Sequence, residues 1–184
     1  MSRGIVIASA IAVLNCCVLG AASARADDGG CAGAGAIADD ATIKEAVDAV
    51  LCLVNGERAQ HGLRPVRASS ALTRSAQAHS RDMVQRGYFS HVTPSGENAR
   101  QRVVQSGYAR KRGARRVGET IAWGSGERGT PAELVRLFMA SAAHRGIVLD
   151  RRFRDVGIGL VPAAPVATAA AAGVTLTIDF GRRR

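Results

Sequence analysis

The sequence predicts an α+β domain in which helices cover a small antiparallel sheet. Between residues 42 and 140, apolar residues recur at helical spacing in several segments that begin with capping residues. Between residues 156 and 178 the spacing changes, and apolar residues alternate with small or polar ones, as they do in strands. Many helical segments and few strands are typical of this fold class.

The first 26 residues have the features of a secretory signal peptide: a basic start at Arg3, an apolar stretch, and small residues before the end at Ala26. We therefore expect an exported protein that is secreted, extracellular or held in the cell wall. Cys16 and Cys17 follow residues that make a poor lipoprotein site, so we expect them to leave with the signal peptide rather than to carry a lipid anchor. No later stretch is long and apolar enough to span a bilayer.

Residues 27–41 are rich in glycine, alanine and aspartate without periodicity, which predicts a flexible leader before a single domain at residues 42–184. Two cysteines, Cys31 and Cys52, remain after export. An even pair in an oxidising compartment usually forms a disulfide, which would pin the leader to the first helix. Two free buried thiols are the alternative.

The helical pattern begins at Thr42 and ends at Gly62, which predicts the first helix. We interpret Glu57 and Arg58 as part of a solvated or salt-bridged face of this helix, not as site residues.

A second helix is predicted to begin after a cap at Ser69 or Ser70 and to end at Gly87 in the left-handed conformation. His79 falls on its apolar stripe. A hydrogen-bonded interior histidine is commoner there than a ligand, so His79 is left out of the candidate site.

A third helix is predicted at residues 99–106, between a cap at Asn98 and a closing Gly107. The sequence Thr-Pro-Ala-Glu at residues 130–133 marks the start of a fourth, because threonine caps, proline suits the first helical position and glutamate reaches back.

Two strands are predicted at residues 156–160 and 174–178, as antiparallel neighbours joined by an irregular connector. A third strand is predicted at residues 117–123. Gly157 and Gly159 should let a backbone or helix approach the sheet closely.

The formal net charge is +10. Without Arg3 and Arg25, 23 basic residues stand against 15 acidic ones, so the mature net charge is +8. This charge favours anionic partners such as an envelope polymer. The basic cluster at residues 110–116 is interpreted as a solvated loop, and it lacks the interleaved aromatic residues of a nucleic-acid site, so no specific nucleic acid is expected.

Five motifs follow one another in the order of a known family. They are Leu-Val-Asn-x-Glu-Arg at 53–58, Phe-Ser-His-x-x-Pro-x-Gly at 89–96, Gly-Glu-x-Ile-Ala-Trp-Gly at 118–124, Ser-x-x-His-Arg at 141–145 and Asp-Phe-Gly at 179–181. Together they resemble the bacterial branch of the CAP superfamily of cysteine-rich secretory, antigen 5 and pathogenesis-related 1 proteins. The resemblance implies a three-layer α-β-α sandwich with a small antiparallel sheet, and we expect a monomer.

His91, Glu119 and His144 are the candidate cleft residues, and we expect them to converge although they are far apart in the sequence. Two imidazoles and a carboxylate can hold a divalent metal such as zinc or move protons. The resemblance implies a cleft with two histidines and two acids. The second acid has no counterpart here, because the segment at 138–141 reads Phe-Met-Ala-Ser.

Commoner bacterial members carry other, polar side chains at the positions of Thr120, Ala140 and Ile147. This chain should therefore have fewer hydrogen-bonding side chains around the cleft to hold the cleft residues in place. Ser90 and Ser141 lie near the histidines, but no nucleophile elbow surrounds them, so no catalytic residue is assigned.

The sequence therefore favours a binding protein over an enzyme. The expected ligand is a small apolar or amphipathic molecule or a cell-wall component, with a divalent metal as a further ligand. A metal-dependent hydrolase and a basic cell-wall interaction module are the alternatives.

Overall fold

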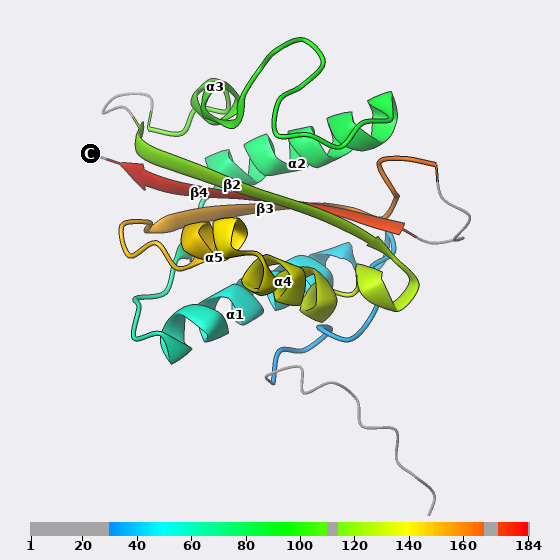
Figure 1. Cartoon of the computed structure of the whole chain (residues 1–184), viewed down its shortest axis with the longest axis horizontal. Helices are drawn as coiled ribbons and strands as arrows, with labels where there is room; N and C mark the ends of the chain where they lie inside the picture. The colour runs from blue at the N-terminus through cyan, green and yellow to red at the C-terminus, as the bar shows by residue number, and fades with distance from the viewer. Residues whose placement is uncertain (1–29, 110–113, 168–172, 184) are drawn as a thin grey trace, which may run out of the picture.

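The computed structural model describes residues 30–109, 114–167 and 173–183, so the predicted signal peptide lies outside the described residues. The described chain folds into three layers, with a sheet between two groups of helices (Figure 1). The elements are α1 (Ile43–Gln60), β1 (Arg67–Ala68), α2 (Ser70–Arg86), α3 (Ala99–Gln105), β2 (Ala114–Ser125), the 3-10 turn η1 (Gly126–Gly129), α4 (Pro131–Ala140), α5 (Ala142–Val148), β3 (Asp155–Val161) and β4 (Gly173–Arg183).

The sheet has the strand order β1-β3-β4-β2, in which β4 pairs antiparallel with both β3 and β2, and the short β1 pairs parallel with β3. Helices α2 and α3 cover one face, and α1, α4 and α5 lie on the other (Figure 1). The α+β class and the three-layer sandwich are confirmed. Strand β2 lies at an edge of the sheet, which places its residues beside both helical layers.

The ends of three helices follow the prediction, whereas Ser69 precedes α2 without a capping hydrogen bond from its side chain. Asn98 accepts a hydrogen bond from the backbone N–H of Gln101, and the Gln101 side chain accepts one from the Asn98 backbone, which closes a capping box at the start of α3. Thr130 caps α4 by accepting from the Glu133 N–H. Gly87 ends α2 with a φ of 67°, the left-handed region that glycine adopts without strain.

Helix α2 lies directly against the backbone of β3 at two glycines. A Cβ added to Gly157 would stand 2.0 Å from the carbonyl carbon of Leu72, and one added to Gly159 would stand 2.2 Å from that of Ala76. Both predicted close approaches are therefore confirmed, and they fix the distance between α2 and the sheet.

The main core lies between the sheet and the layer of α1 and α4, with Phe138, Leu160 and Phe180 among its fully buried side chains. Arg58 is also fully buried, and its guanidinium donates to the backbone carbonyls of Val148 and Asp150, among others. The interpretation of Arg58 as part of a solvated face was wrong: it ties α1 to the end of α5.

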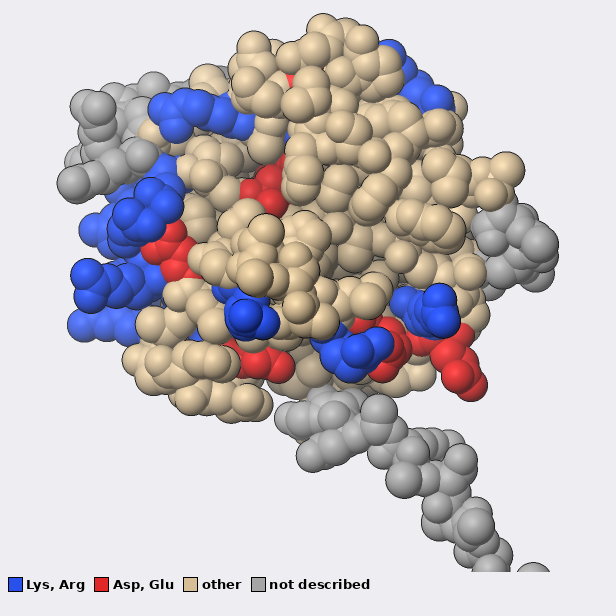
Figure 2. All heavy atoms as spheres, in the orientation of Figure 1, with Lys and Arg blue, Asp and Glu red and all other residues tan. Residues whose placement is uncertain are grey.

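Three local features go beyond the sequence-based expectations, which are a short extended link after the first helix and a turn that holds His144 after the fourth helix. The segment after α1 contributes the strand β1, because it pairs with β3 far along the chain. Strand β2 begins at Ala114, so the end of the basic cluster belongs to the sheet, while residues 110–113 lie outside the described residues. Figure 2 shows Lys and Arg side chains gathered around this end of the molecule. His144 lies in the helix α5, capped by Ser141, rather than in a turn.

The described part of the predicted leader packs against the domain. Ala34 and Ala38 are buried, and the carbonyl oxygen of Ala34 accepts from the N–H of Ala132 at the start of α4. Cys31 and Cys52 form the predicted disulfide, which attaches this segment to α1. Residues 30–41 are therefore held by backbone and apolar contacts as well as by Cys31. None of the helices within the described ranges could cross a membrane on length and hydropathy.

Candidate functional site

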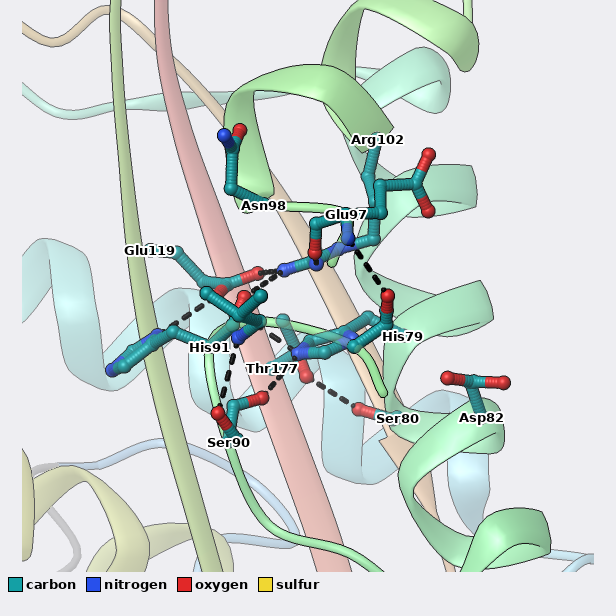
Figure 3. Close-up of polar contacts among 12 residues, drawn as sticks. His79, Ser80, Asp82, Ser90, His91, Glu97, Asn98, Arg102, Glu119 and Thr177 are labelled. Atoms are coloured by element: carbon teal, nitrogen blue, oxygen red, sulfur yellow. Dashed lines mark hydrogen bonds and ion pairs between the residues drawn. The ribbon is translucent and has the colours of Figure 1, made fainter. Parts of the chain in front are cut away.

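The three predicted site residues come from three elements that meet around the edge strand β2. His91 lies on the segment after α2, Glu119 on β2 and His144 on α5. His91 Nδ1 lies 2.7 Å from Glu119 Oε1, and the ring centroids of His91 and His144 are 6.4 Å apart. The His91 ring reaches across β2, as Figure 3 shows. The structure thus places all three side chains in one neighbourhood, although only His91 and Glu119 share a hydrogen bond.

Glu119 is the buried centre of this neighbourhood, with 2 % of its side chain exposed. Its second oxygen, Oε2, accepts from Nη2 of Arg102 on α3 at 2.5 Å. Arg102 also donates to the carbonyls of His91 and Glu97, so one guanidinium holds both the carboxylate and the segment that carries His91. Arg102 was not predicted as a site residue.

Burial alone would raise the pKa of Glu119, but the hydrogen bond from His91 and the charge of Arg102 outweigh it and hold this pKa below its ordinary value. Glu119 is therefore ionised at neutral pH. Burial, followed by the nearby His91, lowers the pKa of His144, which favours its neutral form. The electrostatic centre is an arginine–carboxylate pair with one exposed imidazole attached.

His79 on α2 is also part of this network, contrary to the sequence analysis, which left it out. The ring is fully buried, and Nε2 donates to the carbonyl of Ser90 at 3.0 Å and lies 4.0 Å from Glu119 Oε1 (Figure 3). Burial lowers the pKa of His79, so the imidazole is neutral. It is an interior histidine, as expected, but it supports the segment before His91.

Asp179 on β4 is a buried acid beside Glu119. The two residues are direct cross-strand partners, so their side chains share the sheet face that α2 covers. Asp179 is fully buried, and within the described residues neither carboxyl oxygen has a hydrogen-bond partner. Burial, and then the charge of Glu119, raises the pKa of Asp179 well above its ordinary value. The sequence offered a signal that was missed: Thr175, Thr177 and Asp179 form a polar stripe on a strand, and all three are buried.

Asp179→Asn is expected to stabilise the protein at pH 7. The raised pKa keeps the native carboxyl protonated to a higher pH than in the unfolded chain, where it ionises above a pKa of about 3.9, so rising pH favours unfolding until the native group ionises. The advantage of the asparagine variant over the native chain should therefore shrink as the pH falls towards 4. Urea denaturation of both proteins between pH 4 and 8 measures it.

Asp39→Asn is the matched control, because hydrogen bonds from Thr42 lower the pKa of this exposed carboxyl. A depressed native pKa contributes stability above the ordinary pKa that is lost as the pH falls, so the control should show the opposite trend. Equal pH profiles for the two variants would contradict the raised pKa of Asp179.

An apolar groove lies along the edge of β2 next to His144. Its volume is about 310 Å³. Trp123 lies in its wall, Phe89 and Leu137 are each 40 % exposed, and the ring of Phe138 meets His144 edge-on at 5.4 Å. The full lining is Phe89, Ile121, Ala122, Trp123, Leu137, Phe138, Ser141 and His144.

A larger, polar hollow of about 590 Å³ lies between α2 and α3. Both His79 and Arg102 line it, together with Asp82 and Glu97. Arg102 thus contacts this hollow while its guanidinium holds Glu119 and the segment that carries His91.

A metal ion bound by His91, Glu119 and His144 would need ligand atoms that already form hydrogen bonds within the protein. Glu119 Oε1 accepts from His91 and Oε2 from Arg102, so Glu119 orients the His91 ring and would have to break a bond to coordinate a cation. Within residues 30–109, 114–167 and 173–183, no group of three or more His, Cys, Asp or Glu side chains is arranged to hold a metal ion.

Comparisons with known proteins agree with the geometry. The model of the cysteine-rich secretory protein family matches residues 51–171. An uncharacterised protein of Bacillus subtilis, YkwD, is 34 % identical over 119 residues, which cover 65 % of this chain and 44 % of the relative. The chain thus matches less than half the length of that curated relative.

Three solved structures share the fold. An extracellular protein with an SCP domain from Bacillus anthracis has a TM-score of 0.63 at 21 % identity, covering 79 % of this chain and 44 % of that one. An outer surface protein from Borrelia burgdorferi has a TM-score of 0.64 at 15 % identity, covering 82 % of this chain and 99 % of that one. A cysteine-rich secretory protein from Staphylococcus aureus has a TM-score of 0.56 at 14 % identity, covering 76 % of this chain and 39 % of that one.

Proposed function

Since the chain belongs to the cysteine-rich secretory protein family, we propose that it is a secreted or cell-envelope protein that binds a small amphipathic ligand in the groove along β2. The apolar part of the ligand lies between Phe89, Trp123 and Leu137, and its polar end lies near His91 and His144. The signal-peptide features and the extracellular or surface origin of similar structures support the location. Intact-mass analysis of exported protein that begins at Asp27 tests it.

The observation that carries the proposal is an exposed apolar groove beside two imidazoles. Large apolar side chains at the surface lose contact with water when a ligand covers them, and the imidazoles supply orienting polar contacts at one end. Phe89 lies on the segment after α2 and Leu137 lies on α4, while Ile121 and Trp123 come from β2 between them. The edge of β2 therefore forms the base of the groove.

The state of Glu119 supports binding rather than acid–base catalysis. A general acid or base must reach the proton that it transfers. Glu119 is buried, and both of its oxygens already accept hydrogen bonds from Arg102 and His91. Its lowered pKa keeps it ionised, and the neighbouring Asp179 is fully enclosed.

Leu137→Asn is expected to weaken binding of an amphipathic probe, dansyl-undecanoic acid, roughly three- to eightfold, because complete burial of a leucine contributes about 1.5–3 kcal/mol and the ligand covers only the exposed 40 % of Leu137. Trp123 is the single tryptophan of the chain and lines the groove, so energy transfer from it to the dansyl group reports occupation directly. Titration of purified protein with the probe gives the affinity.

Val104→Asn is the matched control, since Val104 is an exposed apolar residue (49 %) on α3, away from the groove lining. Its affinity for the probe should equal that of the native protein. Equal losses of probe affinity in both variants would show that the groove is not the binding site. Probe binding without energy transfer from Trp123 would show the same.

A further inference from the structure

A third hollow has a volume of about 430 Å³, and all of its lining residues in the described part of the chain are arginines. Its residues come from the start of β2, the α5–β3 connection and the end of β4, which are segments far apart in the sequence. Figure 2 shows basic side chains gathered at this end of the sheet. We call it the arginine pocket, and its lining is Arg116, Arg151, Arg152, Arg154 and Arg182.

Three of the five guanidinium groups are held in place by the fold, among them that of Arg152, which donates from Nε and Nη2 to the two carboxylate oxygens of Asp150. Arg116 donates from Nε to Asp150 at 2.7 Å and lies over the ring of Phe153, 5.8 Å from its centroid. Arg154 donates from Nη1 to the backbone carbonyls of Arg151 and Phe153. None of these three guanidinium groups uses all five of its N–H groups in these interactions, so donors remain for a ligand.

The charges in the arginine pocket are not balanced by the protein. Of the acids in the described chain, Asp150 alone forms ion pairs with lining residues, namely Arg116 and Arg152. Arg151 and Arg182 form no ion pair within the described residues. Five positive charges around one hollow repel one another, and a bound anion would remove that repulsion.

We propose that the arginine pocket binds an anion that carries at least two phosphate groups. The planar fork of arginine matches two phosphate oxygens, and several forks around one hollow can hold successive phosphates. The volume exceeds that of a single phosphate group, and the excess of positive over negative charge suits a multiply charged ligand. This site is separate from the groove, which lies near the other end of β2, and it does not depend on the proposed function.

The test is calorimetric titration of the mature protein with inorganic tripolyphosphate at pH 7. The double variant Arg151→Gln/Arg182→Gln should lose affinity at least tenfold, because both side chains line the pocket while making no ion pair that holds the fold. Inorganic monophosphate should bind at least tenfold more weakly than tripolyphosphate to the native protein. Unchanged thermal melting of the variant shows that it is folded.

The control is Arg81→Gln/Arg128→Gln, which removes the same charge from exposed positions on α2 and η1. It should retain native affinity apart from a small, salt-sensitive loss. The proposal is overturned if the control weakens binding as much as the pocket variant, or if monophosphate binds as tightly as tripolyphosphate. It is also overturned if a single-stranded oligonucleotide competes with tripolyphosphate and binds with higher affinity than tripolyphosphate does. That result would assign the pocket to nucleic acid.

Discussion

Arg102→Met is expected to lower the free energy of unfolding by about 3–5 kcal/mol, because removing one partner of a buried ion pair leaves the other charge unpaired. Arg102 and Glu119 expose 6 % and 2 % of their side chains, so water can replace little of the lost contact. The same change frees the carbonyls of His91 and Glu97, which Arg102 holds. Urea denaturation at pH 7 measures the loss.

Two further variants separate charge from packing at this pair. Arg102→Met/Glu119→Gln removes both charges, so it should be more stable than Arg102→Met alone. Arg102→Lys keeps the charge but not the planar fork that reaches three acceptors, so its stability should lie between that of the native protein and the methionine variant. A methionine variant as stable as the native protein would show that the pair contributes nothing to the fold.

Loss of the Cys31–Cys52 disulfide is expected to lower the free energy of unfolding by about 3 kcal/mol, since the bond closes a loop of roughly twenty residues in the unfolded chain. The double variant Cys31→Ala/Cys52→Ala measures the effect in urea. Because Ala34 and Ala38 remain packed against the domain, the native fold should survive at 25 °C.

Reduced native protein is the control for packing. Cys31 is 4 % exposed, so its replacement removes some apolar contact in addition to the covalent link. Reduction breaks only the disulfide bond. The decreases in the free energy of unfolding of the reduced protein and of the double alanine variant should therefore differ only by the small contribution of the lost apolar contact. Intact-mass analysis after alkylation must show no free thiols in the oxidised protein, and two labelled thiols there would contradict the bond.

The sequence predicted the features that depend on neighbouring residues. The caps at Asn98 and Thr130 and the left-handed Gly87 act within one helical turn, so short motifs suffice to locate them. The close approach of a helix at Gly157 and Gly159 was predicted because glycines within strands commonly mark such approaches.

The features that sequence reasoning missed depend on partners far along the chain. Arg58 is a buried donor only because the end of α5 brings the Val148 carbonyl to it. Arg102 and Asp179 join the site through Glu119, one by an ion pair and the other by strand register. No local spacing reports such pairings, and the family resemblance supplied the three residues that were found.

The strand order has a kinetic consequence, because β2 pairs with β4, the last strand among the described residues, rather than with β3, the strand that follows β2 in sequence. The partner of Glu119 in the ladder, Asp179, lies 60 residues further along the sequence (179 − 119). Contacts between distant parts of a chain form slowly, since a long loop must close before they contribute. The helices of this protein can form early, but the sheet and the cleft assemble only when β4 has docked between β3 and β2, so deleting residues 173–183 would remove the interior strand, its buried core side chains and the site together.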